Sequence, residues 1–277
     1  MIPFDLTYHR PSSISEAVQL FEQIQKQGKT PLYYNGGTEI ITLSRLNLVF
    51  ADAVIDIKHI PECRVLDRKQ NELTLGAALS LTTIEEANPF PLLAKAASEV
   101  ADHTARNQIT LGGNVCGQIF YRETVLPLLL ADCDVVIAGK SGLRQHSIHE
   151  VFDQHIRLEP GEFLVQIKVD PIYTTMPHIH IKRRKQGNVG YPLVTVSMIK
   201  KERDLRVAFS GVCPFPFRSQ AVEEQLNARH LPIETRIVRA LQQLPEPILD
   251  DVEGSAEYRL FVLKNILTDM LIALEEG

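Results

Sequence analysis

Hydrophobic positions in the first 170 residues alternate between helical and strand-like spacing. Apolar residues recur every three or four positions from Ala17 to Ile24, directly after Ser13 and Glu16, whose side chains are spaced to form a capping box. Gly28 is suited to end this helix in a left-handed conformation. A second capping box at residues 82–85 predicts another helix start, and helical segments follow at residues 91–100 and 125–130. Short apolar runs predict strands at residues 31–34, 53–57, 73–77, 134–138 and 163–169.

The pattern changes after Asp170-Pro171. Segments that alternate or run apolar predict an antiparallel three-stranded sheet at residues 178–182, 193–199 and 205–210. Helical periodicity follows at residues 221–226, 233–241 and 260–274. We therefore place a domain boundary near residue 172. It separates a larger domain, residues 1–172, from a smaller domain of antiparallel sheet plus helices, residues 173–277.

The composition of the 277-residue chain is that of an ordinary globular protein, with 44% hydrophobic and 23% charged residues. The net charge is −5, and the basic cluster from Lys182 to Lys185 is too short to follow a nucleic-acid backbone. The first residues lack the basic stretch and apolar run of a signal peptide, and Lys264 and Asp269 interrupt the apolar segment near the end. We therefore expect a cytoplasmic protein that binds neither nucleic acid nor a membrane.

The cysteines and histidines do not predict a metal site. Cys63, Cys116, Cys133 and Cys213 are far apart in the sequence, whereas iron–sulfur and structural zinc sites usually have closely spaced thiolates. We expect reduced thiols here, so that any iron–sulfur cluster that works with this chain belongs to another chain. His178 and His180 share one face of a predicted strand but lack an evident third ligand, so we expect them to be solvated or hydrogen-bonded. The adjacent acids Asp250-Asp251 are expected to interact with the dipole of the following helix.

Two glycine pairs, Gly36-Gly37 and Gly112-Gly113, each follow an apolar segment. Glycine lets backbone N–H groups approach a phosphate closely, and Thr38 and Asn114 directly after the pairs add polar side chains. Two such loops that face each other would suit a pyrophosphate. The simpler interpretation is that each pair forms only a tight turn, which is the more frequent role of Gly-Gly. Neither pair fits a Walker A loop or the Gly-x-Gly-x-x-Gly fingerprint, so both interpretations stay open.

Taken together, several segments resemble the flavoprotein subunits of the molybdenum hydroxylases, the family that includes xanthine and carbon monoxide dehydrogenases. The resemblance covers essentially the whole chain and is closest in overall character to the bacterial xanthine dehydrogenase FAD-binding subunits. The two loops Asn35 to Ile40 and Arg106 to Asn114 are similar to the flavin loops of this family, and the second is the more specific. Further matches occur at Phe4–Leu6, Pro11–Ala17, Leu158–Leu164, Gly211–Arg218 and Ala256–Arg259.

This resemblance implies an α+β fold, in which a two-part FAD-binding domain of the PCMH type precedes a small C-terminal domain. It further implies that electrons from a molybdenum cofactor on one partner subunit pass through 2Fe-2S clusters on another, reach FAD on this chain and leave to NAD, with xanthine or hypoxanthine as substrate. No catalytic or metal-binding residue is expected, because the flavin itself performs hydride transfer. The residues that the resemblance assigns to FAD binding are Tyr33, Tyr34, Asn35, Gly36, Gly37, Thr38, Glu39, Ile40, Thr110, Gly113, Asn114, Cys116, Glu123, Phe163, Leu164 and Lys182.

The chain departs from the family pattern after the second flavin loop. Many relatives have small residues, then Ser-Pro and an Asp that contacts the cofactor, whereas this chain has the bulky Ile119 and Phe120 and places Glu123 at the Asp position. Two alternatives to the xanthine assignment stay open. In the first, the partner subunit oxidises carbon monoxide, an aldehyde or another heteroaromatic compound, with NAD or a different acceptor. In the second, for which Ile119 and Phe120 are the argument, the chain is a structural subunit without flavin.

Overall fold

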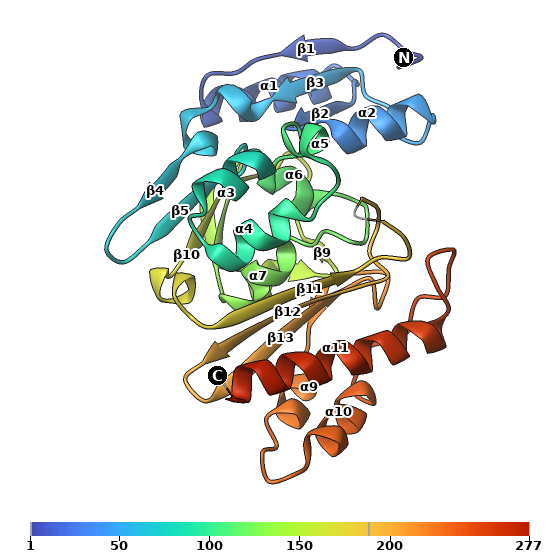
Figure 1. The fold of residues 1–277 in the computed structure, drawn as a ribbon. Coiled ribbons are helices and arrows are strands. Elements are labelled where there is room, and N and C mark those ends of the chain that lie inside the picture. The colour runs from blue at the N-terminus through green and yellow to red at the C-terminus, as the bar shows by residue number, and fades with distance from the viewer. Residues whose placement is uncertain (1, 188, 277) are drawn as a thin grey trace.

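The computed structural model describes residues 2–187 and 189–276. Three sheets follow one another from the top to the bottom of Figure 1, each covered by helices. The upper two sheets are formed by residues up to Val169, and the third belongs to the C-terminal part of the chain. The mixture of parallel and antiparallel sheets with helices confirms the predicted α+β class.

The first sheet is parallel, with the order β1 (Thr7–His9), β3 (Ala53–Asp56), β2 (Pro31–Tyr34). It is accompanied by α1 (Ile14–Lys26) and α2 (Thr38–Arg45). The capping box predicted for α1 is half correct. The Ser13 hydroxyl accepts a hydrogen bond from the Glu16 amide, but the Glu16 carboxylate accepts from the amide and hydroxyl of Ser12 and not from the Ser13 amide. Gly28 adopts the left-handed conformation expected, with φ of +74°.

The second sheet is antiparallel and has five strands in the order β4 (Leu66–Arg68), β5 (Leu73–Gly76), β10 (Phe163–Val169), β6 (Asp134–Gly139), β7 (Gly142–Ser147). A large hydrophobic core lies between this sheet and the helices α3 (Leu81–Ala87), α4 (Pro91–Ser98), α5 (His103–Arg106), α6 (Leu111–Cys116), α7 (Val125–Leu130) and α8 (Ile148–Val151). A short hairpin joins β8 (Phe152–Asp153) to β9 (His155–Ile156). The second predicted capping box is wrong, because Ser80 and not Thr82 caps α3.

The third sheet contains the predicted antiparallel meander, β11 (His178–Arg183), β12 (Val194–Lys201) and β13 (Asp204–Ser210), extended by the short strand β14 (Phe217–Arg218). Single turns of 3₁₀-helix lie between β3 and β4, at Ile57–His59 and Pro61–Arg64, and between β10 and β11, at Pro171–Thr174. Helices α9 (Gln220–Leu226) and α11 (Ala256–Glu276) pack against the third sheet, and α10 (Ile233–Leu241) packs on both helices; together they enclose a separate core. In Figure 1 the long α11 lies across this sheet.

A fully buried arginine on α11 organises the loops of this last unit. Arg259 donates to the carbonyl oxygens of Leu193 and Gly211, and its guanidinium also pairs with the carboxylate of Asp251. The sequence analysis did not identify Arg259 as the partner of Asp251, and the expected interaction with the helix dipole stays a prediction. The carboxylate neutralises the buried guanidinium, which would otherwise be costly to remove from water.

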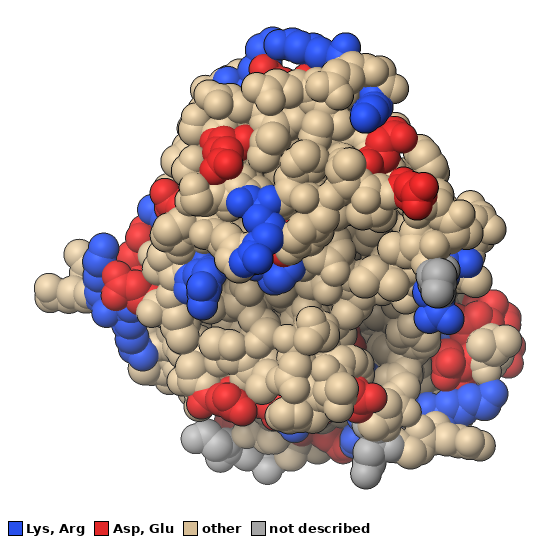
Figure 2. Space-filling view, turned by 90° about the horizontal axis from the view of Figure 1, so that it is seen from above, with Lys and Arg blue, Asp and Glu red and all other residues tan. Residues whose placement is uncertain are grey.

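Within the described ranges, no helix combines the length and the hydrophobicity that a membrane span requires. Seen from above the first sheet, Lys and Arg lie in separate small groups, several of them beside Asp or Glu (Figure 2).

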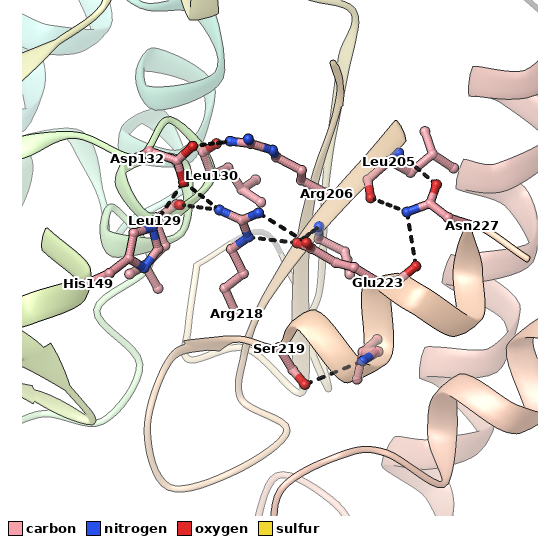
Figure 3. Close-up of polar contacts among 12 residues, drawn as sticks. Leu129, Leu130, Asp132, His149, Leu205, Arg206, Arg218, Ser219, Glu223 and Asn227 are labelled. Carbon is pink, nitrogen blue, oxygen red and sulfur yellow. Dashed lines mark hydrogen bonds and ion pairs between the residues drawn. The ribbon is translucent and has the colours of Figure 1, made fainter. Parts of the chain in front are cut away.

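The second and third sheets are linked by a carboxylate at the end of α7. Asp132, which has a left-handed backbone, accepts hydrogen bonds from Nε2 of His149 at 3.0 Å and from Nη1 of Arg218 at 2.7 Å (Figure 3). It also accepts from Arg206 and from the hydroxyl of Tyr173. Partial burial alone would raise the pKa of Asp132, but the hydrogen bonds from His149 and Arg206 outweigh it and hold the pKa well below its usual range.

We expect Asp132→Asn to weaken this junction by about 1 kcal/mol at neutral pH, because the carboxylate is one-third exposed and screened by water. Since the native pKa lies below the unfolded value of about 4, the carboxylate stabilises the fold above that pH and loses its contribution as the pH falls through the native pKa. The urea midpoint of the wild-type chain should therefore fall more steeply below about pH 4 than that of the variant. Equal acid dependence in the two proteins would contradict this role.

Candidate functional site

The two glycine pairs, far apart in the sequence, lie against each other. A Cβ atom on Gly36 would be 2.1 Å from the carbonyl oxygen of Gln108 and 3.2 Å from the amide nitrogen of Thr110. No side chain fits in that space, so glycine is required at this close approach. The first loop therefore packs directly on the backbone that leads into the second.

Both loops are held by one carbonyl group at the end of β5. The oxygen of Ala77 accepts from Nδ2 of Asn35 at 2.9 Å and from the amide of Gly112 at 2.8 Å. The neighbouring backbone continues this pairing, since the amide of Leu111 donates to the oxygen of Leu79. The arrangement favours two facing loops, as a pyrophosphate site needs, over two independent tight turns.

The first loop leads into the N-terminus of α2. Gly37 is the N-cap with φ of +73°, and it has no side chain to cap the helix. Among the residues that the structure describes, no acceptor takes a hydrogen bond from the backbone N–H groups of residues 38–40. Free N–H groups at a helix N-terminus, together with the helix dipole, favour an anion such as a phosphate.

The second loop is the first turn of α6, where the sequence had predicted a glycine-rich turn. Thr110 is the N-cap, and its hydroxyl accepts from the amide of Gly113 at 3.1 Å. Gly113 is exposed, and a Cβ atom there would meet only the Thr110 hydroxyl, at 2.8 Å. The surface over Gly113 is therefore open. The adjacent Asn114 points inward, where its Oδ1 accepts from the hydroxyl of Thr124 at 2.6 Å.

A charged pair beside the first loop was missed by the sequence analysis. Lys58 donates from Nζ to the carbonyl oxygen of Asn35 at 2.8 Å and to the buried carboxylate of Asp56 at 2.8 Å. Residues 31–34 and 53–57 were both predicted strands, but only the parallel pairing of β2 with β3 in the structure brings their ends to the same sheet edge. The loop after β2 and the residues after β3 are thus neighbours.

A cavity of about 580 Å³ adjoins the segment that holds the two loops. Its lining combines basic, hydroxyl and apolar groups, which suits a nucleoside next to phosphate. The lining residues are Lys58, His59, Arg64, Leu66, Ala78, Leu79, Ser80 and Thr83.

Several other residues that the resemblance assigned to FAD have partly or fully buried side chains that contact other protein groups. The Tyr33 ring lies between Phe21 and Phe163, with centroid distances of 5.0 and 4.5 Å, and its hydroxyl donates to the carbonyl oxygen of Gly161. Leu164 is buried in the core of the second sheet. Cys116 ends α6, and burial raises the pKa of its thiol to about 12. For these side chains a flavin contact stays a prediction.

Glu39, at the start of α2, binds the segment in which the chain departs from the family. Its two carboxylate oxygens accept from the amides of Gln118 at 2.6 Å and Ile119 at 3.1 Å. In the same segment, Phe120 packs on Tyr121 with a centroid distance of 4.2 Å. The bulky residues are therefore tied to the first loop by Glu39 and do not separate the two loops.

Glu123 and Lys182 bind each other. Nζ of Lys182 lies 2.8 Å from Oε2 of Glu123 and 2.9 Å from the carbonyl oxygen of Glu99, and Thr195 donates to the other carboxylate oxygen of Glu123. Both side chains are almost completely buried, with 1% of the Lys182 side chain and 5% of the Glu123 side chain exposed. Burial raises the pKa of Glu123 and lowers that of Lys182, so each charge depends on the other. Their predicted contact with the cofactor stays a prediction.

The other ionisable candidates have ordinary hydrogen-bonding roles. His178 pairs through Nδ1 with the carbonyl oxygen of Met176 at 2.9 Å, and His180 pairs with the Ser197 hydroxyl at 2.8 Å, as expected for hydrogen-bonded histidines. Within residues 2–187 and 189–276, no three His, Cys, Asp or Glu side chains converge as metal ligands would. Three of the thiols are buried in three different cores: Cys63, Cys133 and Cys213.

The residues present fit FAD. The free N–H groups of residues 38–40 and the open surface over Gly113 would hold the pyrophosphate, and the cavity beside Ala78 would hold the adenosine half. The buried Oδ1 of Asn35, which has no protein partner, is an acceptor next to the first loop.

Comparison with known proteins agrees with this geometry. Residues 3–171 match the family described as the FAD binding domain in molybdopterin dehydrogenase, and residues 181–274 match the CO dehydrogenase flavoprotein C-terminal domain. The carbon monoxide dehydrogenase medium chain of Hydrogenophaga pseudoflava is 27% identical and aligns with 94% of this chain and 93% of its own length. The nicotinate dehydrogenase FAD-subunit of Eubacterium barkeri is also 27% identical, over 99% of this chain and 98% of its own.

The xanthine dehydrogenase FAD-binding subunit of Escherichia coli O157:H7 is 24% identical over 94% of this chain and 92% of its own length. Among solved structures, quinoline 2-oxidoreductase from Pseudomonas putida 86 superposes with a TM-score of 0.85 at 21% identity, covering 99% of this chain and 97% of the other. The chain therefore belongs to the FAD-binding subunits of the molybdenum hydroxylase family.

Proposed function

We propose that this chain passes electrons from an iron–sulfur partner subunit through FAD to NAD, in a complex whose molybdenum subunit oxidises xanthine or hypoxanthine. The observation that supports an FAD role most directly is the meeting of two glycine loops on the oxygen of Ala77, beside an uncapped helix N-terminus. The bound flavin would supply the hydride chemistry. The chain itself binds and orients FAD and leaves the flavin accessible to both electron donor and acceptor.

The protein groups at the site have binding roles. The N–H groups of residues 38–40 neutralise phosphate charge, Gly113 leaves space for it, and Thr110 fixes the turn that presents Gly113. No side chain at the site is assigned an acid or base role, because the flavin would itself supply the hydride chemistry.

We infer partner subunits because the described residues of this chain do not bring together the thiolate ligands that an iron–sulfur cluster needs. Its buried thiols lie in separate cores, which supports 2Fe-2S clusters on a second subunit and the molybdenum cofactor on a third. Relatives described as a medium chain or an FAD-subunit support the same division. We place the FAD-binding domain at residues 1–172, the C-terminal domain at residues 173–277, and the protein in the cytoplasm, where NAD is available.

The purine assignment is supported by relatives named for purine substrates, the xanthine dehydrogenase subunit and the caffeine dehydrogenase subunit beta of a Pseudomonas strain. Its test is the assembled complex, assayed anaerobically with xanthine, carbon monoxide and nicotinate in parallel. Flavin reduction by xanthine alone supports the proposal. Reduction by one of the other compounds instead would replace xanthine and keep the electron-transfer role.

The NAD assignment is tested on the purified chain by its visible spectrum. We expect a flavin spectrum with one FAD per chain, bleached by anaerobic NADH and restored by NAD. A flavin that stays oxidised with NADH both in the isolated chain and in the complex would exclude NAD as the acceptor. A chain that stays colourless after addition of FAD would favour a structural subunit without flavin.

A further inference from the structure

We propose that Lys58 is a positioning residue for FAD: its ammonium group fixes the first glycine loop, and its side chain, which also lines the cavity, places a positive charge beside that loop. The inference rests on the FAD-binding part of the proposed function and does not depend on the substrate or on NAD.

The contacts of Lys58 connect a rigid strand to the loop. The carboxylate of Asp56, at the end of β3, is 99% buried and accepts from Nζ of Lys58 at 2.8 Å, from the Lys58 amide at 2.9 Å and from the hydroxyl of Tyr8. Asp56 is thus held in place from three directions. Through Lys58 this fixed carboxylate is linked to the carbonyl oxygen of Asn35, one residue before Gly36.

The direction of the ammonium group is set by more than these two hydrogen bonds. Nζ lies 4.6 Å from the centroid of the Tyr34 ring, whose hydroxyl in turn covers Gly37. The side chain of Asn35 is held separately by Ala77. Lys58 therefore holds the backbone carbonyl group of Asn35, while the carbonyl oxygen of Ala77 holds its side chain. Together these contacts orient the turn that presents the free N–H groups of residues 38–40.

The charge of Lys58 is also available to a ligand. An ammonium group has three protons, and two are used by Asp56 and Asn35. The side chain is 36% exposed and lines the cavity together with His59 and Arg64. A phosphate at the loop would meet a cation that is already oriented, so little side-chain entropy is lost on binding.

If Lys58 had only a structural role, its loss would destabilise the fold; if it positions the loop, its loss should weaken ligand binding and leave the fold intact. Asp56 keeps the Tyr8 hydroxyl if Lys58 is lost, and the sheet order does not involve the Lys58 side chain. The fold should therefore survive the loss of Lys58, while the loop loses its anchor. Pyrophosphate-containing ligands should then bind less tightly, all by a similar factor.

The experiment measures FAD affinity by flavin fluorescence quenching, and ADP affinity by competition with FAD, on the purified chain after removal of flavin. Lys58→Met should weaken both by about tenfold to hundredfold, as expected for one charge-assisted hydrogen bond. Lys58→Arg should recover affinity to within about threefold of wild type, because arginine keeps the charge and the donors. Lys69→Met, which removes an exposed lysine, is the matched control and should change neither affinity.

The double variant Lys58→Met/Asp56→Asn covers the case in which an unpaired Asp56 impairs folding, and it should show the same weakened affinities. Wild-type FAD affinity in both Met variants would overturn the proposal. So would a loss for FAD that ADP does not share, or an arginine variant no better than methionine. Failure of the FAD-binding function itself is seen separately, as a wild-type chain that binds no FAD.

Discussion

Gly113→Asp is expected to lose FAD at concentrations that saturate the wild-type chain. The Cβ atom at this position faces open surface and meets only the Thr110 hydroxyl, so the new carboxylate enters the open space over the second loop, where we propose that the pyrophosphate binds. Two unit charges about 4 Å apart at an effective dielectric constant of about 20 repel by about 4 kcal/mol. Such repulsion between the carboxylate and a phosphate lowers affinity about a thousandfold.

The position allows a control for stability. Gly113 is the third residue of α6, where a negative charge interacts favourably with the helix dipole, so Gly113→Asp should not unfold the helix. Gly113→Asn has nearly the same size without the charge and should lose about tenfold to hundredfold less affinity. Equilibrium dialysis of FAD with thermal denaturation of each variant separates binding from folding. Stoichiometric FAD in the Asp variant would place the pyrophosphate elsewhere.

Elements buried on most sides could be predicted from the sequence. The apolar segments at residues 125–130 and 163–169 were predicted as a helix and a strand, and the structure contains α7 and β10 there. Both predictions succeeded because these elements are buried, so their residues are continuously apolar. Edge elements were missed. Strand β7 has a polar, largely exposed surface, so nothing in its hydrophobic pattern separates it from a loop. Strand β14, with two residues, is defined only by its partner β13.

The candidate site was predictable in its parts and not in its assembly. Each glycine pair was identified locally, but the contact between Gly36 and Gln108 joins segments 72 residues apart, and no local signal specifies it. The same limit applies to Ala77, whose contribution is a backbone oxygen that any residue has. Lys58 was missed because its role depends on the parallel pairing of β2 with β3, which the apolar runs do not determine.

The resemblance placed Glu123 and Lys182 beside the cofactor, whereas the structure places them in contact with each other at the junction of the second and third sheets. The pair has a structural consequence that the sequence did not predict. Glu123 precedes α7 and Lys182 lies on β11, so one buried ion pair joins the two parts of the chain.

Lys182→Met is expected to destabilise the chain by about 3 to 5 kcal/mol, because the variant leaves the carboxylate of Glu123 buried without its cation. Among the described residues, the Thr195 hydroxyl alone then remains as a side-chain donor to Glu123. Burial, which already raises the pKa of this carboxyl group, will favour proton uptake. The loss is a large share of the roughly 5 to 15 kcal/mol that stabilises a typical domain. Urea denaturation followed by circular dichroism measures it.

A double-mutant cycle separates the pair from a cofactor role. Lys182→Met/Glu123→Gln removes both charges and should recover most of the lost stability. Lys168→Met, which breaks a partly exposed ion pair between a strand residue and Glu72, should cost less than about 1 kcal/mol. If the double variant is stable and binds FAD like wild type, the pair acts only at the junction. If it is stable but binds FAD weakly, Glu123 and Lys182 also serve the cofactor, as the family pattern implies. A double variant as unstable as Lys182→Met would contradict the ion-pair explanation, because the penalty would then not come from the unpaired carboxylate.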